Sequence, residues 1–135
     1  MRYFMEPTGV AIVGASQDFT TINGKILKHL VKHKFLGQIY PINPKYQEIA
    51  GLTCYSTVEA IPAQVDLALI AVAAARVPDI LRDCGAKGIK RAVIFSSGFA
   101  ENGAEGKAIQ EDIIKIGQEF QMRLIGPNCL GIYFS

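Results

Sequence analysis

Five apolar stretches recur along the chain, and each is free of the polar alternation that marks a strand with one face in water. Continuous hydrophobicity of this kind indicates strands that are covered on both faces, as in a parallel sheet. The expected strands are residues 10–13, 39–42, 67–72, 92–95 and 123–125.

Three of the gaps between these strands carry apolar residues at the three- and four-residue spacing of an amphipathic helix. These stripes run through residues 22–31, 77–84 and 109–120. Glycines lie near the stripe ends, where a left-handed cap or close packing requires them: Gly37, Gly85, Gly88 and Gly117.

Strands that alternate with helices predict an α/β fold, specifically a Rossmann-like doubly wound parallel sheet of about five strands with helices on both faces. We expect the strand order 3-2-1-4-5, with a ligand crevice at the carboxyl ends of the first and fourth strands. The second and third strands are joined by a thinner connection. It contains Gly51, a short β-like segment at 53–55, and a capping box from Ser56 to Glu59 that opens a short helix.

Composition narrows the class of protein. With 135 residues, 50% of them apolar and 19% charged, residues 1–135 are expected to form one domain. The longest apolar run, 67–75, is well short of the ~20 residues of a membrane-spanning helix. The first residues lack the apolar stretch of a secretory signal.

The cysteines indicate a reducing compartment. There are three of them, an odd number, and their spacing matches neither a disulfide framework nor a zinc site. We therefore expect reduced thiols and a cytoplasmic location.

The charge distribution is mild. The net charge is +2, with six Lys and Arg against three acids in residues 1–50. No basic block of the kind that binds nucleic acid occurs in the sequence, and a few cations suit a phosphorylated small molecule better.

The first strand is followed by small residues that indicate a phosphate-binding loop, because the next helix would point its N-terminal N–H groups at an anion. The candidates are Gly14, Ala15, Ser16 and Gln17. The sequence is not G-x-G-x-x-G, and a tight strand-to-helix turn without a ligand is the alternative.

The other strand ends add a cation and more small residues. Lys45 stands where an NAD-binding domain has an acid, which favours a phosphate on the adenosine ribose, as in NADP or coenzyme A (CoA). The alternative is a solvated loop lysine.

The third and fourth strands end in small residues. Val72 and Ala73 would let a ligand lie against the backbone, or would allow close packing of the next helix. The serines and glycine after the fourth strand could bind ligand or cap a helix: Ser96, Ser97 and Gly98.

Several segments together carry a family resemblance. They are Gly14–Ser16, Ile39–Lys45, Gly51–Tyr55, Val65–Ala68, Ser96–Glu101 and Ile125–Ile132. In these segments the chain resembles the N-terminal CoA-binding domain of NDP-forming acyl-CoA synthetases, which is similar to the succinyl-CoA synthetase α subunit. The resemblance covers about Thr8 to Ile132, and the final Gly-Pro-Asn-Cys-Leu-Gly-Ile segment is its most specific part.

The resemblance implies that loops after successive strands grip CoA. By position, Gly14 to Gln17 would lie along the phosphates, and Lys45 would approach the ADP end. Val72 and Ala73 would border the adenine or pantetheine, and Ser96 to Gly98 would guide the pantetheine arm. Two departures from the family pattern are Ala73, where members often have proline, and Asn23, where they tend to have glycine.

The family's chemistry passes through an acyl phosphate and a phosphorylated histidine, which lies in a later domain. The two histidines here, His29 and His33, share a lysine-rich helix side and are expected to be solvated. Cys129 has no histidine after it in the sequence to act as a base. We therefore assign no catalytic residue and no metal. Family members continue past the position of Ser135, so we expect an N-terminal fragment that binds CoA or acyl-CoA and needs downstream ligase and nucleotide-grasp domains for turnover.

Two other functions stay open on the sequence alone. One is a CoA- or nucleotide-sensing regulatory module fused to an acetyltransferase, which domains of this kind also resemble. The other is an NADP-binding oxidoreductase domain, which Lys45 favours and the missing G-x-G-x-x-G disfavours.

Overall fold

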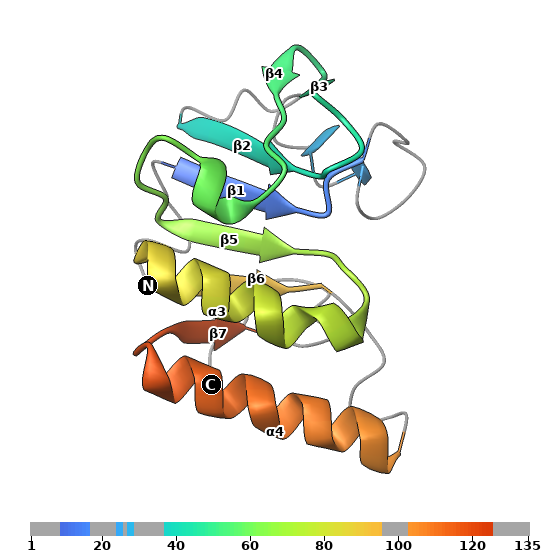
Figure 1. The fold of residues 1–135 in the computed structure, drawn as a ribbon, viewed down its shortest axis with the longest axis vertical. Helices are drawn as coiled ribbons and strands as arrows, with labels where there is room; N and C mark the ends of the chain where they lie inside the picture. Colours follow the sequence, from blue (N-terminus) through green and yellow to red (C-terminus); the bar gives the residue numbers. More distant parts are fainter. Residues whose placement is uncertain (1–8, 17–23, 26, 29–36, 96–102, 126–135) are drawn as a thin grey trace.

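A five-stranded parallel sheet runs through the centre of the molecule (Figure 1). The structure is a computed structural model that describes residues 9–16, 24, 25, 27, 28, 37–95 and 103–125. All four pairs of neighbouring strands are parallel, which confirms the predicted Rossmann-like α/β class. The strands are β1 (Gly9–Val13), β2 (Gln38–Ile42), β5 (Leu67–Ile70), β6 (Arg91–Ile94) and β7 (Arg123–Ile125).

The order of these strands differs from the expected one. They lie as β2-β1-β5-β6-β7, which is 2-1-3-4-5 when the five are counted along the chain, so the expected order 3-2-1-4-5 is wrong. Pro41 supplies the physical reason. Proline has no N–H for a strand ladder and belongs on an edge strand, whereas the expected order would put β2 between two neighbours. The order reverses between β1 and β5, so the crevice of this fold lies at the carboxyl ends of the first and third strands and not, as expected, of the first and fourth.

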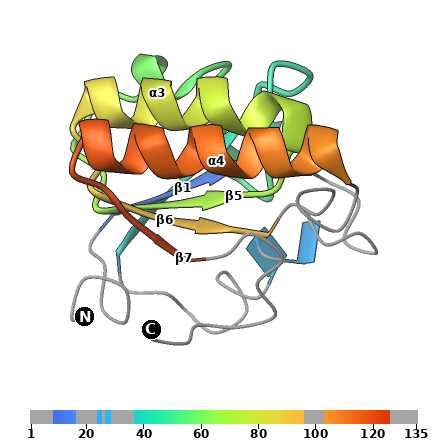
Figure 2. The ribbon, with the colours of Figure 1, turned by 90° about the horizontal axis from the view of Figure 1, so that it is seen from below.

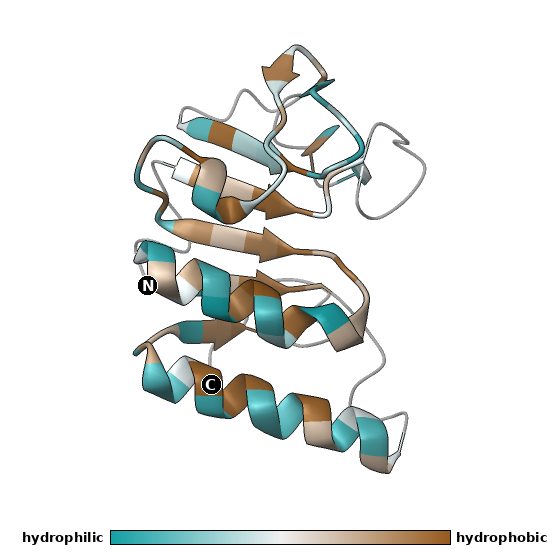
Figure 3. Cartoon of the chain, viewed as in Figure 1, coloured by the Kyte–Doolittle hydropathy of each residue, from teal (hydrophilic) through white to brown (hydrophobic). Residues whose placement is uncertain are grey.

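Two helices cover one face of the sheet (Figure 2). They are α3 (Val77–Lys87) and α4 (Ala104–Glu119), and both follow predicted stripes. Buried residues form the inner side of each helix and polar residues the outer side, as the colouring in Figure 3 shows. Helix α3 ends at Gly88, which has a φ of 95° and donates its N–H to the carbonyls of Cys84 and Gly85. This is the left-handed cap expected there.

The opposite face is covered in part by the helical residues 24, 25, 27 and 28 (Figure 2). Leu27 is fully buried and belongs to the same cluster as Val10 and Ile12 of β1. Since successive side chains of a strand point to opposite faces, Ala11 and Val13 belong to the other cluster, on the α3 side. The expectation of helices on both faces is confirmed.

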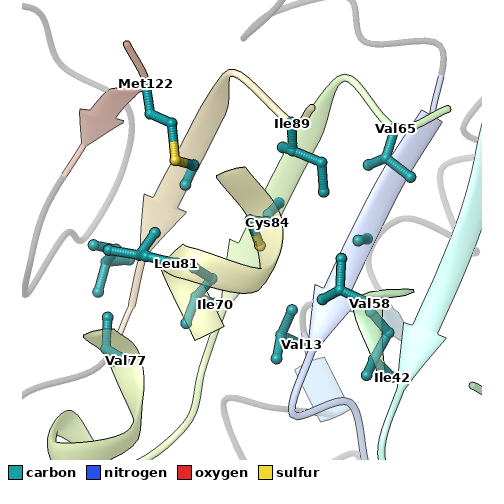
Figure 4. Close-up of a cluster of buried hydrophobic side chains, with 14 of the residues drawn as sticks. Val13, Ile42, Val58, Val65, Ile70, Val77, Leu81, Cys84, Ile89 and Met122 are labelled. Atoms are coloured by element: carbon teal, nitrogen blue, oxygen red, sulfur yellow. The ribbon is translucent and has the colours of Figure 1, made fainter. Parts of the chain in front are cut away.

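The larger core cluster lies between the sheet and α3 with α4 (Figure 4). Ile70 of β5 and Leu81 of α3 are both 0% exposed at its centre. Val13 and Ile42, the last residues of β1 and β2, belong to the same cluster. The strand ends that carry the candidate site are therefore anchored in the core.

The connection from β2 to β5 begins with a small hairpin of β3 (Glu48–Ile49) and β4 (Leu52–Thr53). Its turn places Ala50 at a φ of 53° and Gly51 at 80°. Tyr55 then forms a parallel bridge with Ile42, which extends the edge of the sheet. The β-like character expected around residues 53–55 is confirmed.

A single 3-10 turn, η1 (Val58–Ala60), follows. The expected capping box with Ser56 at the N-cap is wrong, because the N-cap is Thr57, whose Oγ1 accepts from the Ala60 N–H at 3.3 Å. Val58 is 1% exposed, and its burial sets the turn. The helix stays short because Ile61 precedes a proline and is extended, with φ −67° and ψ 125°.

Within the part of the chain that the structure describes, neither α3 nor α4 nor any shorter helical segment has the length and hydropathy to cross a membrane.

Candidate functional site

A pocket of about 680 Å³ opens where β1, β2 and β5 end. Small-molecule sites typically measure ~300–1,000 Å³. The pocket contains residues that directly follow β1, β2, β5 and β6, and it is closed laterally by residues 56–58 and by α3. It therefore lies at the β1/β5 reversal, where ligands of open α/β sheets bind.

Gly14 forms part of the pocket floor. Its φ is 88°, and a Cβ built there would lie 2.6 Å from the Ala71 carbonyl oxygen and 3.0 Å from Val72 Cγ1. The position therefore requires glycine for two reasons, a left-handed backbone and a close approach of two loops. The expected tight turn after β1 is present, and it opens onto a pocket.

The first N–H groups of this loop are occupied within the protein. Gly14 and Ala15 both donate to the Ile42 carbonyl, at 2.9 and 3.2 Å. Ala15 is 0% exposed and Ser16 is half-buried, and neither of them lines the pocket. The loop therefore offers a ligand space beside Gly14, whereas the N–H groups of Gly14 and Ala15 are already bonded to Ile42.

Lys45 lies at the pocket as the third residue of a turn that follows β2. The turn starts at Asn43, whose carbonyl accepts from the Tyr46 N–H at 3.3 Å and whose Oδ1 accepts from the Lys45 N–H at 2.9 Å. Lys45 is exposed. Its ammonium has no hydrogen bond or ion pair with the described residues, so its charge is available to a ligand.

The segment after β5 brings Val72 and Ala73 to the same pocket, as expected from their strand-end position. Val72 is half-buried and Ala73 is exposed. The short helix η2 (Ala74–Arg76) follows and leads directly into α3. Arg76 is exposed and also lines the pocket, which adds a second cation that the sequence interpretation did not select.

Helix α3 supplies one side of the pocket through Ile80 and Asp83. Asp83 follows Arg76 by seven positions, which is about 10 Å along a helix. Because α3 starts at the carboxyl edge of the sheet (Figure 1), Arg76 lies near that edge and Asp83 lies farther back. The pocket therefore has cations at the strand ends and, farther from that edge, an exposed carboxylate on α3.

The opposite side comes from residues 56–58. The Thr57 hydroxyl already caps η1, and Val58 is part of the core. In the sequence these residues have only a structural interpretation, as a helix cap. Neither a strand-end position nor a ligand-binding motif marks them, because they reach the pocket only through the path of the connection from β2 to β5.

Four candidate residues lie outside the described residues: Gln17, Ser96, Ser97 and Gly98. Phe95, immediately before Ser96, lines the pocket, so the chain after β6 starts at the site. His29, His33 and Cys129 also lie outside the described residues.

The two described cysteines are packing residues. Burial raises the pKa of Cys84 to about 12, and a smaller effect from Asp83 acts in the same direction. Burial also raises the pKa of Cys54, although its hydrogen bond to Asn43 opposes the shift. Both thiols therefore stay protonated at neutral pH and are poor nucleophiles. Among the described residues, no group of three His, Cys, Asp or Glu side chains is placed to hold a metal ion.

The sequence comparisons point to one family. The CoA binding domain family matches residues 8–135. The α subunit of an ADP-forming acetate–CoA ligase II from Pyrococcus furiosus is 41% identical over 132 residues, covering 98% of this chain and 29% of that protein. An ADP-forming acetate–CoA ligase from Methanocaldococcus jannaschii is 44% identical over 132 residues, covering 98% of this chain and 18% of that protein.

A solved structure gives the same result. The apo form of a dinucleotide-forming acetyl-coenzyme A synthetase 1 from Ca. Korarchaeum cryptofilum superposes with a TM-score of 0.90 at 38% identity, over 96% of this chain and 28% of that one. The chain therefore spans less than a third of the length of these relatives. The acetyltransferase-linked sensor and the NADP-binding domain receive no support from these comparisons.

Proposed function

This chain belongs to the CoA-binding domain family, and we propose from that premise that it binds CoA in the pocket at the β1/β5 reversal. We propose further that it does so as the CoA-binding part of an ADP-forming acyl-CoA ligase. The observation that carries the proposal is the composition of the pocket: Gly14 and Ala73 leave room at the strand ends, and the cations Lys45 and Arg76 stand at the same place.

CoA is suited to such a pocket because it is long, anionic at one end and uncharged at the other. A pyrophosphate and a 3′-phosphate need cations or N–H donors, and Lys45 with Arg76 would supply the cations. The pantetheine arm needs a channel without charges. Val72, Ala73 and the segment that begins after Phe95 would provide it.

The proposed placement keeps the expected residues with one change of role. Lys45 would meet the ADP end, Val72 and Ala73 would contact the adenine or pantetheine, and Ser96 to Gly98 would guide the arm. Gly14 and Ala15 would act by shape, since both of their N–H groups are bonded to Ile42. Phosphate contacts in this loop would then come from Ser16 and Gln17.

The ligase reaction interconverts acyl-CoA, phosphate and ADP with the free acid, CoA and ATP. The phosphohistidine and the nucleotide-binding groups would belong to the ligase and nucleotide-grasp domains that this chain works with. Alone, the 135 residues would bind CoA or acyl-CoA without turnover. CoA and adenine nucleotides are intracellular, and reduced thiols suit the same compartment, so we propose a cytoplasmic location.

Calorimetric titration of the chain with CoA, 3′-dephospho-CoA and NADP tests the proposal. CoA is expected to bind most tightly, with dephospho-CoA weaker by about tenfold for the lost phosphate contact. Tighter binding of NADP than of CoA would overturn the proposal and favour an NADP-binding oxidoreductase domain.

A further inference from the structure

The side chain of Asn43 joins two loops of the proposed CoA site. Its Nδ2 donates to the Ala15 carbonyl at 2.8 Å, across 28 residues of sequence. Its Oδ1 accepts from the Lys45 N–H at 2.9 Å. One amide group therefore holds the loop after β1 and the turn that carries Lys45 in a fixed relation.

The two bonds require both ends of an amide. The Ala15 carbonyl needs a donor and the Lys45 N–H needs an acceptor, and asparagine offers both on a short side chain. Aspartate could replace only the acceptor, and it would bring a negative charge beside the proposed phosphate site. Serine could accept from Lys45, as in a Ser/Thr turn, but would be too short to reach Ala15.

Little else among the described contacts orients Lys45. The backbone of its turn is closed by the Tyr46 N–H on the Asn43 carbonyl at 3.3 Å, near the long limit of such bonds. By contrast, the backbone of Asn43 itself is firmly placed, since its N–H donates to the Tyr55 carbonyl at 2.9 Å. Asn43 is thus an anchored residue, and Lys45 depends on it.

We propose that Asn43 is a positioning residue that presents the Lys45 ammonium to CoA by tying its turn to the loop after β1. The inference rests on the proposed function. It assigns to Asn43 no contact with the reacting atoms. Its effect on CoA binding passes through Lys45 and the loop after β1.

The test is a double-mutant cycle of Asn43→Ser and Lys45→Met, read by calorimetry with CoA. Asn43→Ser is expected to weaken CoA binding about fivefold, the usual effect of one lost hydrogen bond. In the Lys45→Met chain the same change is expected to weaken binding less than about twofold, because the ammonium to be positioned is gone. Gln47→Ser is the matched control, since Gln47 is exposed and does not line the pocket. This substitution is expected to leave CoA affinity unchanged.

The outcomes separate the two proposals. If the wild-type chain takes up no CoA, the proposed function fails and this inference falls with it. If the wild type binds and Asn43→Ser binds equally well, only the inference fails. Equal losses with and without Lys45 would show that Asn43 supports the site in general and does not position the cation.

A measurement on the wild-type chain covers the case in which Asn43→Ser does not fold. The Lys45 N–H is expected to exchange with solvent at least about tenfold more slowly than an unbonded loop amide, because it is held by Asn43 Oδ1. Exchange at the rate of an open loop would overturn the inference.

Discussion

Gly14 and Gly85 both lie where a side chain would clash, but they have different neighbours and different roles. A Cβ at Gly14 would lie 2.6 Å from the Ala71 carbonyl oxygen, whereas a Cβ at Gly85 would overlap the ring of Phe120. Gly14 brings two loops together beside an open pocket, whereas Gly85 brings α3 against the end of α4 in the core. A glycine required by close packing therefore does not by itself indicate a binding site. Gly14 lies at a pocket with cations, whereas Gly85 packs against the half-buried ring of Phe120.

The largest effect is expected from Gly14→Ala. The new Cβ meets a backbone carbonyl that cannot turn aside, and the φ of 88° is unfavourable for alanine. We expect a loss of about 3 kcal/mol of unfolding free energy together with loss of CoA binding. Urea denaturation and calorimetry measure the two effects. A stable Gly14→Ala chain that binds CoA normally would contradict the role of this position.

Gly85→Ala is expected to separate stability from binding. The clash is with the near end of the Phe120 ring, which has to move as a whole, so the cost is about 2 kcal/mol of unfolding free energy, and CoA affinity should be unchanged. In a chain that also carries Phe120→Ala, most of the cost should disappear. A drop in CoA affinity without unfolding would show that the contact between α3 and α4 belongs to the site.

Lys45→Glu tests the charge at the pocket. The substitution places a carboxylate where a phosphate is proposed, so CoA should bind about tenfold more weakly, equivalent to about 1.4 kcal/mol. Dephospho-CoA should lose clearly less. Lys115→Glu, on the exposed surface of α4, is the matched charge control. Equal losses for the two ligands would remove Lys45 from the 3′-phosphate.

The smallest effect concerns Cys84, next to Gly85. Burial raises the pKa of Cys84 in the folded chain to about 12, from an ordinary value of 9.0. The folded state therefore holds the proton more tightly, and this stabilisation is present below pH 9 and is lost as the pH rises toward 12. By pH 10 it amounts to a loss of about 1 kcal/mol. Denaturation between pH 8 and pH 10 should show a shallower decline for Cys84→Ala, and identical slopes would mean that this region is wetter than the structure indicates.

Most of the architecture could be predicted because burial on both faces leaves a continuous apolar pattern in a strand. The strand order 3-2-1-4-5 is wrong although Pro41 indicates an edge strand, because a residue without an N–H belongs there. Gly14, Lys45, Val72 and Ala73, which the sequence predicts as ligand contacts, line the pocket, since parallel strands bring their carboxyl ends to one edge. Their contact with a ligand stays a prediction.

The sides of the pocket could not be predicted in the same way. Ile80 and Asp83 lie on a helix, and the sequence pattern interprets Ile80 as core. Which turn of α3 faces the pocket depends on how the helix packs over the sheet, and that packing is set by tertiary contacts. Thr57 and Val58 reach the site by a long connection that local rules do not describe.

If the proposed function is right, CoA binds at the β1/β5 reversal and leaves the contact between α3 and α4 unchanged. Titration of the isotope-labelled wild-type chain with CoA, followed by amide chemical shifts, locates the bound ligand. We expect the largest shifts at Gly14, Lys45 and Val72, with Gly85 and Gly88 unchanged. Shifts centred on Gly85 and Gly88, or no shifts at saturating CoA, would contradict it.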